Sequence, residues 1–311
     1  MTDYKRFVIG VDGGGTKSHA ILVALDGTVI AESRGGPTNL QTAGIQAAVK
    51  TIFELISDCC KQASCPSDAL ESIVLGLAGA GRVLDRTELH NTLSDLSLKK
   101  KFPLKNIIVE TDARIALEAA FAASPGVVLI AGTGSIALYR TEDGKILRAG
   151  GWGSILGDEG SGFAISRDAL NAVMRQYDGR GEKTILTKKA LSHFNVTSVE
   201  DVISKIYHDR EDVSAFCPKV LEAVMERDHI AHNILVKNAG ELVELVRVLT
   251  MQVRPKKKLP VCMMGGLLES ENEYSKLVKE KIVRSLPHVV VQKPKFPAPY
   301  GAAILGLNAF R

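Results

Sequence analysis

The sequence predicts an α/β fold built from two related halves, and two observations carry this prediction. Short apolar, strand-like runs alternate with longer stretches whose apolar residues recur at helical spacing, as in sheets covered by helices. In addition, one strand–loop–strand–turn–strand unit occurs twice, starting near residues 8 and 126. Hydrophobic residues make up 45% of the 311, which is enough for one large core or two medium ones.

The first copy of the repeated unit reads VIGVDGGGTKSHAILVALDGTVIAE, residues 8–32. A turn alone does not need its three successive glycines. A backbone that approaches a bulky anion does, because each missing side chain exposes an N–H. The loop therefore predicts a phosphate site with a magnesium-binding carboxylate at Asp12, although a hairpin that this carboxylate merely caps stays open. The residues expected at this site are Asp12, Gly13, Gly14, Gly15, Thr16 and Lys17.

The second copy, GVVLIAGTGSIALYRTEDGKILRAG, occupies residues 126–150. Alone, its loop is an ordinary hairpin, but as a partner to the first loop it predicts phosphate contacts from Gly132, Thr133 and Gly134. If the two loops face each other, they hold one polyphosphate. Gly265 and Gly266, between a strand and a helix, suit the close approach of a flat or phosphorylated ligand group, with a plain β–α turn as the alternative.

Carboxylates mark two further stretches. Asp112 ends a strand and starts a helix, where it can either accept a proton from an attacking hydroxyl or cap the helix. The run GGWGSILGDEGSG, residues 150–162, holds the only Trp of the chain among glycines. A buried Trp usually has bulky apolar neighbours, so this run predicts a loop shaped around a ligand whose hydroxyls the carboxylates bind. A solvated Asp-Glu turn remains the alternative.

The remaining composition narrows the class of protein. The net charge is +4, and the one basic run, from Arg254 to Lys258, is interpreted as a solvated linker, so no nucleic-acid partner is expected. No apolar run is long enough to cross a bilayer and the N-terminus has no leader pattern, so we expect a cytoplasmic protein without a membrane partner. The cysteines are expected to be reduced thiols without a metal; they are Cys59, Cys60, Cys65, Cys217 and Cys262.

A family resemblance rests on these motifs. The loops at Asp12–Thr16 and Gly132–Ser135, followed by Gly265-Gly266, have the order of the two phosphate motifs and the adenosine motif of the actin-like ATPase/sugar-kinase superfamily. The run GGWGSILGDEGSGFAISRDAL closely resembles the N-acetylglucosamine kinase family, grouped with the BadF/BadG/BcrA/BcrD-type ATPases. The resemblance extends from Val8 to about Leu170 and resumes at Gly265, with no motif across residues 178–258.

The resemblance implies two actin-like (ribonuclease H-like) domains, each a mixed sheet flanked by helices, with a cleft between them. The domains would comprise residues 1–115 with 298–311, and 116–297. ATP and Mg²⁺ would be the cofactors, Asp12 the magnesium-side carboxylate and Asp112 the catalytic base, in contact with the sugar hydroxyl. The sugar contacts implied by the family are Asn39, Gly151, Trp152 and Asp158. Arg114 and the stretch Phe163-Ala164-Ile165 depart from the family pattern.

The expected function is an ATP-dependent hexosamine kinase that transfers the γ-phosphate to the 6-hydroxyl of N-acetylglucosamine or glucosamine. Two alternatives stay open. One is an ATPase activator that drives a partner protein, of the 2-hydroxyacyl-CoA dehydratase type, although residues 126–162 lack the cysteines that would bridge an iron–sulfur cluster. The other is a non-catalytic, sugar-sensing actin-like protein. The identity of the sugar and the formation of a homodimer are left open.

Overall fold

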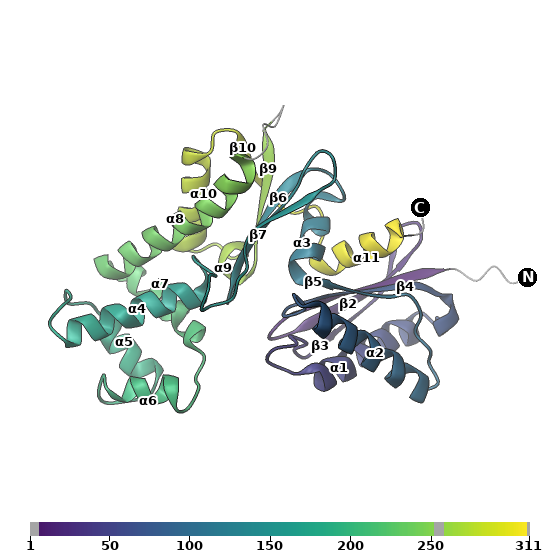
Figure 1. Ribbon diagram of the computed structural model, residues 1–311, viewed down its shortest axis with the longest axis horizontal. Coiled ribbons are helices and arrows are strands. Elements are labelled where there is room, and N and C mark those ends of the chain that lie inside the picture. The colour runs from purple at the N-terminus through teal and green to yellow at the C-terminus, as the bar shows by residue number, and fades with distance from the viewer. Residues whose placement is uncertain (1–5, 252–257, 310–311) are drawn as a thin grey trace, which may run out of the picture. The chain divides into compact units, whose positions relative to one another are not determined.

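The structure is a computed structural model that describes residues 6–251 and 258–309 (Figure 1). The chain divides into two compact units, residues 1–124 with 294–311, and residues 125–293. Most of the basic run that begins at Arg254 lies outside the described residues; its last member, Lys258, is exposed. No helix within the described ranges is long and apolar enough to cross a membrane.

The first unit is a five-stranded mixed sheet with helices on both faces (Figure 1). The strand order is β3-β2-β1-β4-β5; β1 is antiparallel to β2, whereas β4 and β5 run parallel to β1. The strands are β1 (Phe7–Gly13), β2 (Ser18–Ala24), β3 (Val29–Gly35), β4 (Leu70–Leu77) and β5 (Ile107–Thr111). The helices are α1 (Ile45–Gln62), the short η1 (Ser67–Ala69), α2 (Val83–Lys99), α3 (Asp112–Phe121) and α11 (Ala298–Asn308).

The alternation of side chains along β1 explains the two helical layers. Ile9 and Val11 are buried in the core formed with α1 and α2, whereas Val8 packs on the other face against α11. Between them, Gly10 lets α11 lie close to the sheet, since a Cβ there would be 2.2 Å from the carbonyl oxygen of Pro299. Helix α11 also packs against α3, where a Cβ at Gly301 would be 2.0 Å from the Ile115 carbonyl oxygen. The first unit therefore extends through α3, beyond the boundary at residue 115 expected from the sequence.

The second unit repeats the topology of the first. Its strand order is β8-β7-β6-β9-β10, the same arrangement with the second set of strands, which confirms the repeat predicted from the sequence. The strands are β6 (Gly126–Ala131), β7 (Ser135–Arg140), β8 (Ile146–Gly150), β9 (Leu259–Met264) and β10 (Val289–Gln292). The helices are α4 (Gly162–Tyr177), α5 (Leu186–His193), α6 (Asp201–Tyr207), η2 (Val213–Phe216), α7 (Cys217–Met225), α8 (His229–Met251), α9 (Gly266–Glu269) and α10 (Glu273–Ser285).

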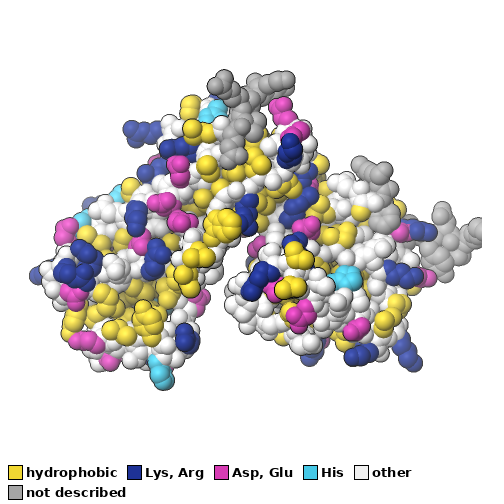
Figure 2. All heavy atoms as spheres, viewed as in Figure 1, with side chains coloured by type: hydrophobic (Ala, Val, Ile, Leu, Met, Phe, Trp, Pro, Cys, Tyr) yellow, Lys and Arg dark blue, Asp and Glu magenta, His cyan; other side chains and the backbone are white. Residues whose placement is uncertain are grey.

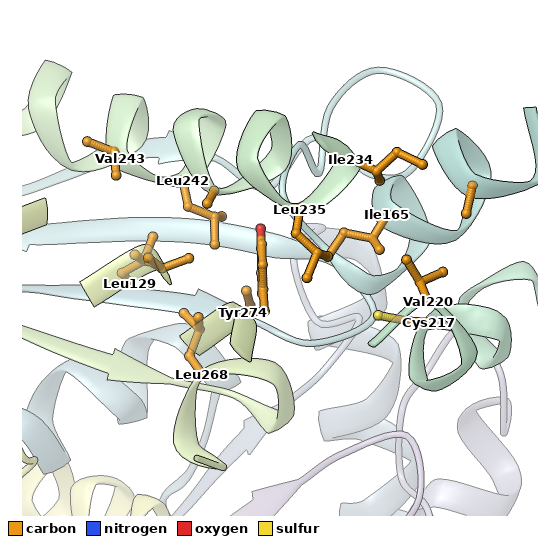
Figure 3. Packing of buried hydrophobic residues seen from close by; sticks show 14 of the residues in the cluster. Leu129, Ile165, Cys217, Val220, Ile234, Leu235, Leu242, Val243, Leu268 and Tyr274 are labelled. Carbon is orange, nitrogen blue, oxygen red and sulfur yellow. The ribbon is translucent and has the colours of Figure 1, made fainter. Parts of the chain in front are cut away.

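The core of the second unit shows what residues 178–258 contribute. Figure 3 shows side chains from α7 and α8 packed together with Leu129 of β6 and Tyr274 of α10. The segment without a recognisable motif therefore supplies helices that complete this core, because α8 covers β6, β7 and β8. On the face drawn in Figure 2, acidic and basic side chains are interspersed over both units and do not separate by sign.

Candidate functional site

The first glycine loop joins β1 to β2 and is fixed by backbone hydrogen bonds, one within the loop and two from the segment that follows β3. The Gly14 N–H donates to the carbonyl oxygen of Lys17 over 3.1 Å, and the Gly14 carbonyl accepts from the N–H groups of Thr38 and Asn39 at 3.0 and 3.1 Å. Gly13 is buried, and a Cβ there would be 2.1 Å from the Thr38 hydroxyl oxygen. Gly13 is thus required for packing, whereas the tip of the loop, residues 15–17, is exposed to a ligand.

Three parallel strands of the first unit end at the same level. Gly13 of β1 pairs with Leu77 of β4, which pairs with Thr111 of β5. Because neighbouring strands lie about 4.8 Å apart, the end of β5 is roughly 10 Å from the glycine loop. Asn39 joins this edge, since its amide nitrogen would be 3.9 Å from a Cβ at Gly15. The structure therefore brings the first-unit predictions, residues 12–17, 39 and 112, to one sheet edge.

Asp112 is the first residue of α3, but it is not the cap. The N-cap is Thr111, whose hydroxyl oxygen accepts the Arg114 N–H at 3.1 Å. Asp112 Oδ1 accepts the N–H of Ala113 at 2.8 Å. Burial raises the pKa of the Asp112 carboxyl, and backbone hydrogen bonds oppose this shift only in part. A carboxylate that is desolvated, raised in pKa and not needed as the helix cap has the properties of a general base.

Arg114, the charged residue beside Asp112, is directed along α3. Its guanidinium forms an ion pair with Glu118, one turn further on, and Glu118 is only 1% exposed. Glu118 also accepts the N–H of Ala123 at 3.1 Å. The positive charge of Arg114, two residues after Asp112, is therefore paired with Glu118 within α3.

The second glycine loop, between β6 and β7, is anchored on the start of α4. The carbonyl oxygens of Gly132 and Thr133 accept the N–H groups of Gly162 and Phe163, at 2.8 and 3.3 Å. Gly265 lies beside this loop with a positive φ of 87°, and a Cβ there would be 2.5 Å from the Ala131 carbonyl oxygen. Its neighbour Gly266 has open space above it. The second-unit predictions at residues 132–134 and 265–266 are thus adjacent.

The loop that carries Trp152 exposes its tryptophan and partly buries Asp158. Trp152 is 63% exposed, with the guanidinium carbon of Arg148 4.0 Å from its ring centroid, so the indole is not part of a core. Asp158 is half-buried and accepts backbone N–H groups of Ser135 and Gly153, and burial raises its pKa. A Cβ on Gly134 would be 2.7 Å from Asp158 Oδ2. The family resemblance implies a sugar contact for Asp158, and in the structure its carboxylate lies beside the second glycine loop.

Two positioning residues escaped the sequence analysis. The Tyr274 hydroxyl of α10 donates to the Gly160 carbonyl oxygen at 2.7 Å, and the Oδ1 of Asn238, on α8, accepts the Gly160 N–H at 3.3 Å. Figure 3 shows the Tyr274 side chain extending from α10 toward α8, on which Leu235 and Leu242 are labelled. Gly160 itself fits here only without a side chain, because a Cβ would be 2.5 Å from the Leu242 Cγ. These contacts hold the end of the Trp152 loop against α8.

The residues present fit a nucleotide phosphate and a divalent cation. At Gly15, Gly132 and Gly266 an added Cβ would meet no atom closer than 3.9 Å, so there is open space beside each of these residues. Such glycine-rich loops bind phosphate through N–H groups, and the adjacent carboxylate of Asp12 is the hard oxygen ligand that Mg²⁺ prefers. ATP with Mg²⁺ is therefore compatible with both loops.

Comparison with known proteins places this architecture in a family. The sequence profile of the BadF/BadG/BcrA/BcrD ATPase family matches residues 9–306. The chain belongs to this family. Its curated relatives include an N-acetylmuramic acid/N-acetylglucosamine kinase of Clostridium acetobutylicum, 32% identical over 96% of this chain and 98% of that protein. An N-acetyl-D-glucosamine kinase of Dictyostelium discoideum is 30% identical, over 98% and 99% of the two chains.

Solved structures agree with the family assignment. A candidate N-acetylglucosamine kinase from Chromobacterium violaceum superposes with a TM-score of 0.77 at 26% identity, covering 97% of this chain and 99% of that one. A ROK family glucokinase from Streptomyces griseus shares the fold, with a TM-score of 0.57 at 18% identity over 96% and 98% of the two chains. The expected fold of two sheets of the actin-like ATPase and sugar-kinase type is confirmed.

Proposed function

We propose that this chain is an ATP-dependent kinase that phosphorylates an amino sugar. The observation that carries the proposal is the similarity to two N-acetylglucosamine kinases at 30% and 32% identity over almost the whole chain. A glucosamine kinase of Vibrio cholerae, 26% identical over 90% of this chain, supports the same substrate class. The half-buried carboxylate of Asp112, directly after β5, is our candidate for the base that such a transfer needs.

In this proposal the two glycine loops bind the phosphates of ATP and its magnesium ion. Backbone N–H groups of Gly15, Thr16, Thr133 and Gly134, with the hydroxyls of Thr16 and Thr133, donate hydrogen bonds to phosphate oxygens, whereas the N–H groups of Gly14 and Gly132 bond within their own loops. Asp12 binds Mg²⁺, and Gly266 leaves room for the nucleoside. Bound ATP·Mg²⁺ supplies the phosphoryl group and neutralises part of its charge, which is the dominant contribution to catalysis in this class of reaction.

Asp112 would act on the acceptor. Its carboxylate accepts the proton of the sugar hydroxyl as the oxygen attacks, and the raised pKa brings the carboxyl closer to that task than an exposed Asp. Asn39 and the loop of Gly151, Trp152 and Asp158 are proposed to orient the sugar. We assign the 6-hydroxyl as the acceptor, because every sugar in the names of the three relatives carries this primary, unhindered hydroxyl.

A coupled ADP-release assay tests the proposal. With Mg²⁺ and ATP, we expect N-acetylglucosamine or glucosamine to stimulate ADP release strongly, glucose less, and the 6-deoxy analogue of the preferred sugar not at all. The Asp112→Asn variant should retain ATP binding and lose about 10²-fold or more in turnover. ATP consumption that no amino sugar stimulates would instead support an ATPase that drives a partner.

A further inference from the structure

The end of helix α1 brings two cysteines together in a defined backbone motif. Ser64 has a positive φ of 49°, the left-handed conformation that follows many helices. The Cys65 N–H donates to the Cys60 carbonyl oxygen at 2.8 Å, and the Ser64 N–H donates to that of Lys61 at 3.1 Å. These two bonds define a Schellman motif, in which the side chains at the positions of Cys60 and Cys65 normally touch.

The Cys65 thiol donates to the Pro66 carbonyl oxygen at 3.4 Å and also influences the neighbouring Cys60 thiol. A hydrogen bond between the two thiols lowers the pKa of Cys65, and the same bond, together with burial, raises that of Cys60. The neighbouring Cys59 has a different environment, since its Sγ lies 3.7 Å from the Ala20 carbonyl oxygen and burial raises its pKa to about 12. Of the three neighbouring cysteines, Cys65 has the thiol most readily ionised and so the most nucleophilic at neutral pH.

A surface groove of about 1290 Å³ brings a small molecule next to this pair, of which Cys65 is the less buried, at 6% exposed against 2% for Cys60. Helices α1 and α2 form its walls, and both Cys60 and Cys65 line it, together with Phe53 and Phe102. Its volume is above the range of about 300–1,000 Å³ usual for small-molecule sites. Its charged lining residues have mixed signs and suit a ligand with carboxylate and ammonium groups; they are Lys50, Lys61, Lys99, Lys100, Glu54, Asp58 and Asp95. No residue assigned to the kinase site lines it.

We propose that Cys60 and Cys65 form a reversible intramolecular disulfide by exchange with a low-molecular-weight, peptide-like disulfide that enters this groove. The Cys65 thiolate attacks one sulfur of the small disulfide, whose S–S bond breaks and releases the first small thiolate. Cys60 then loses its proton to water and attacks the Cys65 sulfur, releasing the second. The two protein thiols are oxidised by two electrons, and the small disulfide is reduced to two thiols that take up the two protons.

The order of attack follows from the hydrogen bond between the thiols. Once Cys65 is in the mixed disulfide, it is no longer a thiolate that accepts the hydrogen bond from Cys60. The main cause of the raised pKa of Cys60 is then removed. Because the Schellman motif places the two side chains side by side, Cys60 then lies next to the sulfur that it must attack. The second step is intramolecular and is expected to outpace reaction with another small thiol.

Peptide mapping of the full chain after incubation with oxidised glutathione tests the proposal. After free thiols are blocked, trypsin cleavage at Lys61 separates the two cysteines, so the disulfide should join peptide 51–61 to the peptide that begins at Gln62. Dithiothreitol should reverse the link. Because the first peptide also holds Cys59, the Cys59→Ser variant is the matched control and should form the same link.

Two further variants separate the steps. Cys60→Ser should accumulate glutathione on Cys65, because no second thiol is left to resolve the mixed disulfide. Cys65→Ser should form no link between the two peptides, and glutathione should add to Cys60 more slowly than to Cys65 in Cys60→Ser, because Cys60 is the more buried of the two. Circular dichroism verifies that each variant is folded. The peptide map of the parent chain tests the proposal even if a variant does not fold. A link between Cys59 and Cys60, or thiols at Cys60 and Cys65 that all remain available to the blocking reagent, would overturn the proposal.

Discussion

Gly265 offers a sharp test of how the second unit is assembled. This residue has φ 87° and ψ 156°, a combination open almost only to glycine. Holding another residue there costs about 1–3 kcal/mol. The new Cβ of Gly265→Ala would also be 2.5 Å from the Ala131 carbonyl oxygen and 2.9 Å from its carbon, a backbone contact that no side-chain rotation relieves. Overpacking of this kind adds about 1–3 kcal/mol.

Gly265→Ala should therefore lower the free energy of unfolding of the second unit by about 2–6 kcal/mol, the sum of these two costs. Urea unfolding followed by circular dichroism measures it. Gly266→Ala is the matched control: nothing lies within 4 Å of its added Cβ, so its stability should match the parent chain. Neutral surface substitutions change stability by less than about 0.5 kcal/mol. A loss of that size for Gly265→Ala would refute the close approach between the ends of β6 and β9.

Further predictions concern the two units separately. Because burial holds the folded-state pKa of Asp112 above its unfolded value of 3.8, its contribution to stability is present at low pH and is lost as pH rises through the folded pKa. Asp112→Asn should thus gain stability over the parent chain toward neutral pH in denaturation curves, while its turnover falls about 10²–10⁴-fold. Tyr274→Phe leaves the Gly160 carbonyl without its donor and should cost about 1–3 kcal/mol in urea unfolding, with a parent-like value contradicting that hydrogen bond. Gly134→Ala would place a Cβ 2.7 Å from Asp158 Oδ2, so the loop must shift and sugar-dependent ADP release should fall below that of the parent chain. Release equal to that of the parent chain would contradict this close contact.

The sheets and glycine loops could be predicted from the sequence because they rest on local signals. Alternating or continuous apolar runs define β1 and β6, and glycines mark the loops that follow them. The cap of α3 was harder to assign, since Thr111 and Asp112 are both good capping residues one position apart. The structure gives the cap to Thr111, so the Asp112 side chain is not the helix cap.

Contacts between distant segments could not be predicted in the same way. Tyr274 reaches Gly160 across 114 positions of sequence, and Asn238 reaches it across 78. Neither residue carries a motif, because its role comes from the packing of α8 and α10 on the sheet rather than from its neighbours in the chain. The contact of Asp158 with the second glycine loop was missed for the same reason.

The central claim is that a glycine loop in each unit binds the phosphates of one ATP. Calorimetric titration with a non-hydrolysable ATP analogue and Mg²⁺ tests it most directly, on the parent chain and on Thr16→Val and Thr133→Val. We predict one nucleotide per chain and a loss of affinity of about 2–10-fold in each variant, the effect of one hydrogen bond worth about 0.5–1.5 kcal/mol. Two independent nucleotides per chain, or parent-like affinity in either variant, would contradict the account.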